Sequence, residues 1–219
     1  MIRRFLAIVL TSIILALTGC GGGSDAPPSI VTDIRSDPLF DGDIMRDPIS
    51  GLLTGTQGNT QSVFAGVDPV TDEEFRAFLD FPLRISGGVP PNAVIASSVL
   101  DIFINSILPQ PLTGTIPIRI DLVSFQPPTL IETYFDPTFQ PALASITITP
   151  PISQADFGNH VLVDVTSLMT VAQQKVLDDF QIRILLLDLG AVPPGLIEIN
   201  DTTGVNRGVL APLLSVTYL

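Results

Sequence analysis

Short apolar runs, each ended by residues that break regular structure, are the feature that most constrains the fold of this chain. From residue 39 onward the runs show little of the 3.6-residue periodicity of an amphipathic helix. Pro, Gly, Asn and Asp separate them, as these residues separate strands in all-β domains. The pattern predicts strands over 75–83, 94–104, 115–123, 145–149, 160–165, 180–187, 196–199 and 213–218. About eight strands indicate an all-β sandwich of the jelly-roll type.

Residues 115–123 carry the clearest strand signal. Ile or Leu stands at positions 116, 118, 120 and 122, and Pro117, Arg119 and Asp121 stand between them. This alternation is typical of a strand with one face on a core and the other in water. Because Pro has no N–H for a neighbouring strand, Pro117 favours an edge position.

One stretch, residues 167–178, has helical rather than strand-like spacing. Apolar residues at 168, 171, 172 and 176 recur at nearly helical intervals. Asp164 and Thr166 precede them and carry side chains suited to capping a helix. We therefore expect one short helix, which covers one end of the sandwich.

The N-terminus has the organisation of an export signal. Arg3 and Arg4 precede an apolar run from Phe5 to Leu17, which is too short to span a bilayer comfortably as a permanent helix. The run ends in LTGC at 17–20, which resembles the bacterial lipobox. We therefore predict a lipoprotein signal peptide over 1–19 and lipidation of Cys20. An ordinary signal peptide with an incidental Cys is the alternative.

A tether is expected to follow the lipidated residue, over 20–38. Residues 21–24 are GGGS and residues 25–29 are DAPPS, a composition that behaves as a flexible linker. Acyl chains at about 0.8 kcal/mol per buried CH₂ would make the membrane attachment durable. Gly21 stands where Asp would favour retention at an inner membrane, so the pattern indicates the outer membrane or cell surface. The folded domain is then expected over 39–219.

Charge and cysteine content exclude several classes of function. Loss of Arg3 and Arg4 with the leader changes the formal charge from −12 to −14. An acidic surface repels nucleic acid and anionic headgroups, so we expect no nucleic-acid partner and attachment to the membrane only through the N-terminal lipid. Cys20 is the only cysteine, which excludes an intramolecular disulfide and a thiolate metal cluster.

Four stretches of the chain together resemble one domain family. They are EFRAFLDF at 74–81, PPNAVIASSVL at 90–100, VDVTSL at 163–168 and APLLSVTY at 211–218. In this order they resemble the R-x-F-L-x-F, P-x-x-A-x-I-x-S-A-x-L, V-D-V-T-x-L and P-x-L-x-V-T-Y elements of DNRLRE-type domains. The likeness covers about 41–219. The six letters that name the family are absent, and Ser98 stands where Ala is usual.

The resemblance implies a jelly-roll β-sandwich like that of many non-catalytic carbohydrate-binding modules. Such domains occur in microbial surface and cell-wall proteins, and some are linked to polysaccharide binding. The motif residues also have a plain structural explanation: Phe78, Leu79 and Ile95 fit a core, and Asp164 fits a helix cap. The motifs therefore specify a fold rather than a reaction.

Catalytic chemistry finds little support among the titratable residues. His160 is the only histidine, and no G-x-S-x-G elbow presents a serine to it, so a solvated histidine at a turn is favoured over a triad. One histidine without a second cysteine does not make a usual zinc site. The acidic stretches 72–74 and 178–179 fit solvated turns better than a glycosidase pair. We expect no catalytic residue, no cofactor and no enzymatic activity.

Two turns carry oxygen ligands of the kind that calcium prefers. Asp41-Gly42-Asp43 and Asn200-Asp201-Thr202-Thr203 place carboxylate, amide and hydroxyl oxygens in or beside glycine-containing turns. Neither stretch is a twelve-residue EF-hand loop, and Asx-rich turns also occur without metals. The sequence leaves a structural calcium open and assigns no metal ligand.

Aromatic residues in the proline-rich segment 126–141 are the candidates for ligand binding. A glycan site needs an exposed ring beside hydrogen-bonding groups, and Tyr134 and Phe139 are the two residues that we assign to it. The alternative is that the rings of this long loop pack onto the sandwich. We thus expect a non-enzymatic envelope lipoprotein whose β-sandwich binds a ligand or has a structural role, with a glycan as the favoured ligand class. A protein-interaction module or an accessory subunit of an envelope assembly is the other hypothesis.

Overall fold

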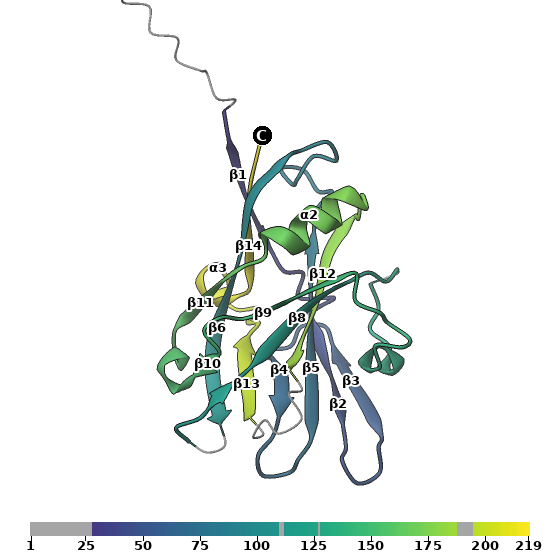
Figure 1. Ribbon diagram of the computed structural model, residues 1–219, viewed down its shortest axis with the longest axis vertical. Helices are drawn as coiled ribbons and strands as arrows, with labels where there is room; N and C mark the ends of the chain where they lie inside the picture. The colour runs from purple at the N-terminus through teal and green to yellow at the C-terminus, as the bar shows by residue number, and fades with distance from the viewer. Residues whose placement is uncertain (1–27, 110–111, 127, 188–194) are drawn as a thin grey trace, which may run out of the picture.

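The computed structural model describes residues 28–109, 112–126, 128–187 and 195–219. Twelve strands of this part of the chain form one antiparallel sheet that curls strongly into a half-barrel (Figure 1). The fold is therefore mostly β, as predicted. The signal peptide and Cys20 lie outside the described residues, so their predictions stand as they were.

The strands follow in chain order as β1 (Ile30–Arg35), β2 (Gly42–Arg46), β3 (Leu53–Gln57), β4 (Ser62–Val67), β5 (Glu74–Pro82), β6 (Ile95–Pro109), β7 (Thr115–Ile116), β8 (Ile118–Val123), β9 (Ala144–Thr147), β10 (Ile152–Ser153), β11 (His160–Asp164), β12 (Asp179–Leu186), β13 (Gly195–Asn200) and β14 (Leu213–Tyr218). The helices are α2 (Thr166–Gln174), α3 (Arg207–Leu210) and the 3₁₀ turns η1 (Glu132–Phe135) and η2 (Gln154–Asp156).

Two long strands organise the sheet. The first half of β6 pairs with β14 on one edge and with β11 on the other, and its second half pairs with β13. In the same way β5 pairs with β2 near its start and with β12 towards its end. The resulting strand order is β1, β14, β6, β13, β4, β5, β12, β8 and β9. Because a strand pairs with different partners along its length, the sheet bends.

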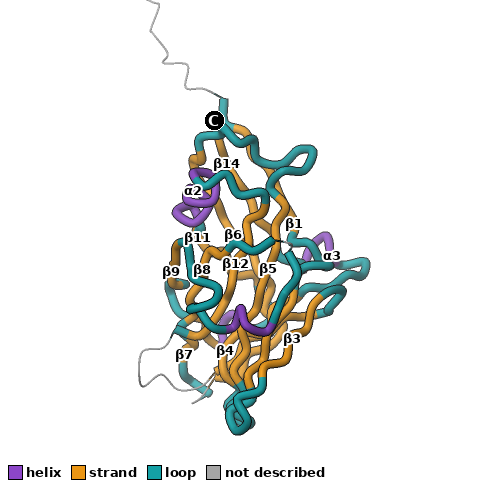
Figure 2. Tube along the Cα trace, turned by 90° about the vertical axis from the view of Figure 1, so that its right-hand side faces the viewer, coloured by secondary structure: helices purple, strands orange, loops and turns teal. Residues whose placement is uncertain are grey.

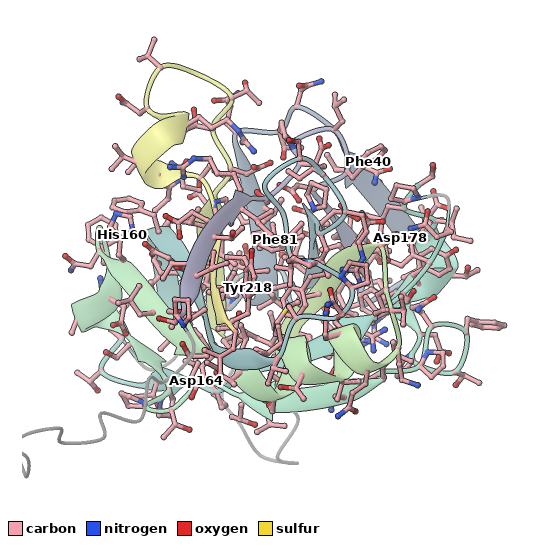
Figure 3. All side chains as sticks on the ribbon, turned by 90° about the horizontal axis from the view of Figure 1, so that it is seen from above. Phe40, Phe81, His160, Asp164, Asp178 and Tyr218 are labelled. Carbon is pink, nitrogen blue, oxygen red and sulfur yellow. The ribbon has the colours of Figure 1, made fainter. Side chains whose placement is uncertain are left out.

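The main core fills the inside of the curl. Alternate residues of β5, among them Leu79 and Phe81, point into it and are almost fully buried. In Figure 3 the side chains of Phe81 and Tyr218 lie centrally. Helix α2 contributes Leu168 and Met169 to the same core and packs against β6, β9 and β12. Figure 2 shows α2 against the strands, at the end of the molecule near the C-terminus.

A second, smaller core lies on the other face of β5. Phe78 alternates with Leu79 and therefore points away from the main core, to pack with Ile44, Phe125 and Phe135. Phe125 and Phe135 belong to the chain between β8 and β9. This segment, residues 124–143, covers the outer face of the sheet, and residue 127 within it is not described. We call it the covering segment.

The strands predicted from the sequence are present with bounds shifted by a few residues, but five others were missed. These are β1 to β4 and the two-residue β10. Strands β2 (GDIMR) and β3 (LTGTQ) lack a run of β-branched residues, and β1 lies within the range predicted to be tether. Pairing with β14 holds β1, pairing with β5 holds β2 and pairing with β13 holds β4, while β3 pairs with β2 and β10 with β7. Tertiary pairing overrides weak local propensity here.

Three other predictions need correction. The range 20–38 was predicted to be tether, yet β1 begins at Ile30 and pairs with β14 along its length. Pro117 does not mark an edge: it separates β7 from β8, and β8 lies between β12 and β9. The Pro117 carbonyl still accepts a hydrogen bond from the Leu187 N–H (2.8 Å). The absent N–H of Pro117 therefore interrupts the strand without placing it at an edge of the sheet. The described residues contain two short α-helices where one was predicted, since α3 was not expected.

Candidate functional site

The covering segment carries both predicted ligand-binding residues, and arginines of the sheet hold it in place. Arg183 on β12 donates from Nη1 to the carbonyl oxygens of Tyr134 (3.1 Å) and Gln140 (3.0 Å). Arg76 on β5 donates to the carbonyl oxygen of Phe135. A loop whose backbone carbonyls are bound by buried guanidinium groups has little freedom to move. Residues 134–140 of the segment are therefore held against the sheet.

Arg183 is itself fully buried, and its charge is balanced by Asp121 on β8. Arg183 Nη2 lies 2.8 Å from Asp121 Oδ2, and neither side chain is exposed. Burial alone would raise the pKa of Asp121. The hydrogen bond from Ser145 Oγ (2.6 Å) and the charge of Arg183 outweigh burial and hold the pKa of Asp121 below its ordinary value. Asp121 thus stays ionised and keeps Arg183 paired.

The aromatic side chains at 134, 135 and 139 of this segment have different environments. The Phe135 ring is buried beneath two guanidinium groups, those of Arg76 at 3.9 Å and Arg46 at 5.1 Å from its centroid. Tyr134 is half-buried, with its ring 4.8 Å from that of Phe125. Phe139 is 67% exposed. Packing therefore accounts for Phe135 and much of Tyr134, and only Phe139 presents an open face.

Glutamines that the sequence did not single out complete the attachment of the segment. Gln57 at the end of β3 donates from Nε2 to the Pro128 carbonyl (3.0 Å) and accepts from the Leu130 N–H (2.9 Å). Gln140 donates to the Ser124 carbonyl (3.0 Å). The sequence gives no signal that these glutamines bind the backbone of the segment, because the residues whose backbone they bind lie 16 or more positions away in the chain.

The two turns considered for calcium meet in the interior. The Asp41 and Asp201 carboxyl groups are both fully buried and lie next to each other. Asp41 Oδ1 accepts from the Asp80 N–H (2.8 Å), and Asp201 Oδ1 lies 3.3 Å from Arg207 Nη1. Asp43 points elsewhere and accepts from the Phe64 N–H (3.0 Å). The structure thus joins one carboxylate from each predicted turn.

Burial and charge favour a proton on this pair of carboxyl groups. Burial raises the pKa of Asp41 well above its ordinary value, and the charge of Asp201 raises it further. Burial also raises the pKa of Asp201. Arg207 balances one negative charge, and Asp41 Oδ2 has no hydrogen-bond partner within the described residues. Nowhere in that part of the chain do three His, Cys, Asp or Glu side chains gather as a metal site.

His160 lies on the surface, at the start of β11. Its Nδ1 is 2.8 Å from Asp101 Oδ1, and its ring meets Phe103 edge-on at 5.1 Å between centroids. Figure 3 shows it at the periphery of the molecule. No serine hydroxyl is hydrogen-bonded to His160 in the described part of the structure. The arrangement is that of a cross-strand polar contact.

A shallow hollow of about 410 Å³ lies in the loop between β5 and β6. Its lining comes from residues 83–91, which include two glycines and two prolines and are mostly apolar. Arg84 Nη1 donates to the Val89 carbonyl (2.6 Å) and so closes the loop on itself. None of the predicted site residues lines this hollow.

Comparison with known proteins does not assign the chain. No protein-family model matches it, and no curated protein does. No helix within residues 28–109, 112–126, 128–187 and 195–219 has the length and apolar character needed to cross a membrane.

Proposed function

We propose that this protein is a non-enzymatic lipoprotein of the cell envelope whose β-domain binds a glycan through the covering segment. The observation that carries the proposal is the exposed ring of Phe139 on a loop that buried arginines hold in place. Sugar rings pack against exposed aromatic faces. A ring on an ordered loop loses little conformational entropy on binding, which favours affinity.

Polar groups beside Phe139 supply hydrogen-bonding partners for a sugar. Asp136 and Thr138 are exposed neighbours in the chain, and Asp136 Oδ1 accepts from the Thr138 N–H (2.7 Å). The acidic balance of the protein, 22 Asp and Glu against 10 Lys and Arg, disfavours an anionic polymer. We therefore propose a neutral polysaccharide as the ligand class.

We also propose that the domain is a jelly roll of the DNRLRE type. Support comes from where the four similar motifs lie. PPNAVIASSVL leads into β6, VDVTSL joins β11 to α2, and APLLSVTY contains β14; β6 pairs with both β11 and β14. EFRAFLDF forms most of β5 at the centre of the sheet. Motifs that meet in the core of one sheet are what a shared fold requires.

The envelope location is proposed from the leader. The lipobox-like LTGC places lipid on Cys20, and Gly21 favours the outer membrane or cell surface. Growth of producing cells with a labelled fatty acid tests this: label should enter the wild-type protein and be lost from Cys20→Ser. Label in both proteins, or in neither, would contradict lipidation at this residue.

Polysaccharide binding is tested with the chain that begins after Pro28, which keeps β1. An array of neutral and acidic polysaccharides is screened with and without calcium. We expect saturable binding to a neutral polymer that Phe139→Ala removes. The matched control is Phe157→Ala, because Phe157 is also an exposed phenylalanine (54%) but lies outside the covering segment. Equal loss in both variants, or no binding to any polymer, would refute the glycan proposal.

Tyr134 needs a gentler substitution because its ring packs on Phe125. Tyr134→Phe keeps the ring and removes only the hydroxyl. If this hydroxyl contacts the sugar, affinity should fall by about 1 kcal/mol, the usual net value of one hydrogen bond. Unchanged affinity would confine the contact to Phe139.

A further inference from the structure

Two hairpin tips of this protein have the same local sequence and the same structure. Asp47-Pro48-Ile49-Ser50 joins β2 to β3, and Asp68-Pro69-Val70-Thr71 joins β4 to β5. In the first, Asp47 Oδ1 accepts from the N–H groups of residues 49 (2.9 Å) and 50 (2.7 Å). In the second, Asp68 Oδ1 accepts from residues 70 (2.7 Å) and 71 (3.2 Å). Each tip is an Asx turn that fixes its own backbone.

Both tips close in the same way. The N–H of Gly51 donates to the Asp47 carbonyl and that of Asp72 donates to the Asp68 carbonyl, each at 2.9 Å. Gly51 and Asp72 both have positive φ, 70° and 60°. Gly and Asp are among the residues that adopt this conformation most readily. Side-chain and backbone bonds together make each tip rigid.

The rigid tips present aliphatic side chains to solvent. Ile49 is 96% exposed, Val70 is 85% exposed and Leu52 is 65% exposed. These side chains are mostly exposed and belong to neither of the two cores described above. Turns normally carry polar residues, whereas these two tips carry a β-branched aliphatic residue at the same position.

Strand pairing brings the tips together at one end of the molecule. The β2–β5 ladder ends with Arg46 opposite Glu74, and the two tips follow directly beyond this pair. Figure 1 shows both hairpins at the end opposite the start of β1 and the C-terminus. The two tips therefore lie at the same end of the domain, far from the start of its N-terminal strand. We call residues 47–52 and 68–73 the twin tips.

The charged residues within the twin tips are all acidic. The tips contain Asp47, Asp68, Asp72 and Glu73 and no Lys or Arg. The nearest cation, Arg46, is paired with Glu74. This charge repels anionic lipid and a second copy of the same surface, and aliphatic side chains lack the flat ring that sugars stack on. The acidic and aliphatic residues of the twin tips are therefore complementary to a surface that is both basic and apolar.

We propose that the twin tips are a docking site for a basic, partly apolar surface of another envelope protein. The inference is independent of the glycan proposal, which concerns the covering segment, and it gives the protein-interaction hypothesis a location. Three exposed aliphatic residues make a small contact, so the complex should be weak and transient and should weaken with added salt.

The test uses the full chain in the cells that produce it. A photo-crosslinking amino acid replaces Ile49, Val70 or, as the control, Val205, which is 100% exposed but lies outside the twin tips. We expect Ile49 and Val70 to yield an adduct with the same basic protein and Val205 to yield none. Different adducts at the two tips, adducts with lipid, glycan or a second copy, or no adduct at all would overturn the proposal.

A second arm tests the charge. Asp72→Asn with Glu73→Gln removes two charges and keeps the Asx turns, since Asn tolerates positive φ and Asp47 and Asp68 are retained. The Ile49 adduct should then fall several-fold, while Asp33→Asn on β1 should leave it unchanged. An adduct of unaltered yield in the neutralised variant would show that charge does not select the partner and would overturn the proposal.

Discussion

Arg183 and Asp121 form an ion pair on neighbouring strands, with 2.8 Å between Nη2 and Oδ2 and no exposure of either side chain. Removal of one partner leaves a buried charge without its counter-charge, at a typical cost of about 3–5 kcal/mol. Asp121→Asn should therefore lower the free energy of unfolding by that amount in urea titrations. Asp33→Asn, at an exposed position, should change it by less than about 0.5 kcal/mol. A similar small change for Asp121→Asn would show that the pair is dispensable.

The buried carboxyl groups predict that the domain is more stable in mild acid than at neutral pH. Burial raises the pKa of Asp43 to about 6 and that of Asp80 to about 7, and it also raises the pKa of Asp41 and Asp201. These groups hold protons in the folded state that the unfolded chain has lost. Their contribution is complete below about pH 4 and is lost as pH rises through about 6 to 7. Asp121 acts in the opposite sense at low pH.

The measurement is the melting temperature between about pH 4.5 and 8, where each kcal/mol corresponds to roughly 2–4 °C. It should fall as pH rises. Asp41→Asn removes one of the titrating groups and should make the fall shallower, whereas Asp33→Asn should leave its slope unchanged. A melting temperature that rises steadily over this range would contradict the protonated carboxyl groups.

Gly66 on β4 predicts a strongly position-dependent effect of alanine. Its φ is 122°, and an added Cβ would lie 2.1 Å from the backbone oxygen of Gly195 on the paired strand β13. Gly66→Ala should destabilise the domain by about 2 kcal/mol or more. Gly208 in α3 has open space around its Cβ position, so Gly208→Ala should be neutral or stabilising by up to about 1 kcal/mol. Chemical denaturation of both variants measures the difference.

Leu168 tests how α2 contributes to the main core. The side chain is fully buried, and α2 packs against β6, β9 and β12. Leu168→Ala should lower the free energy of unfolding by about 2–5 kcal/mol, from lost burial and the cavity that remains. Leu162→Ala on β11, at a residue that is 68% exposed, is the matched control and should have little effect. Equal effects would mean that α2 only lies on the surface.

The sequence by itself determined the fold class and much of the strand set. Alternation in residues 115–123 and the β-branched runs of β6, β12 and β14 predict strands because their apolar residues match the two-residue period of a sheet. Helix α2 was likewise predicted from its helical spacing, with a start within one residue of that observed and an end four residues too late. The prediction that Asp164 or Thr166 caps it was wrong, because the N-cap is Val165, which makes no side-chain cap hydrogen bond. The leader and Cys20 also belong to what the sequence indicates, since export signals are recognised by linear pattern.

Only the tertiary structure decided which residues meet. Asp41 and Asp201 lie far apart in the chain, and each turn alone suggested solvated calcium ligands; burial against Arg207 turns them into a carboxyl pair with raised pKa. The rings at 134, 135 and 139 look alike in the sequence, and the positions of Arg76 and Arg183 under the loop separate the packed rings from the exposed Phe139. Local sequence records propensity, whereas burial and pairing depend on residues that only folding brings near.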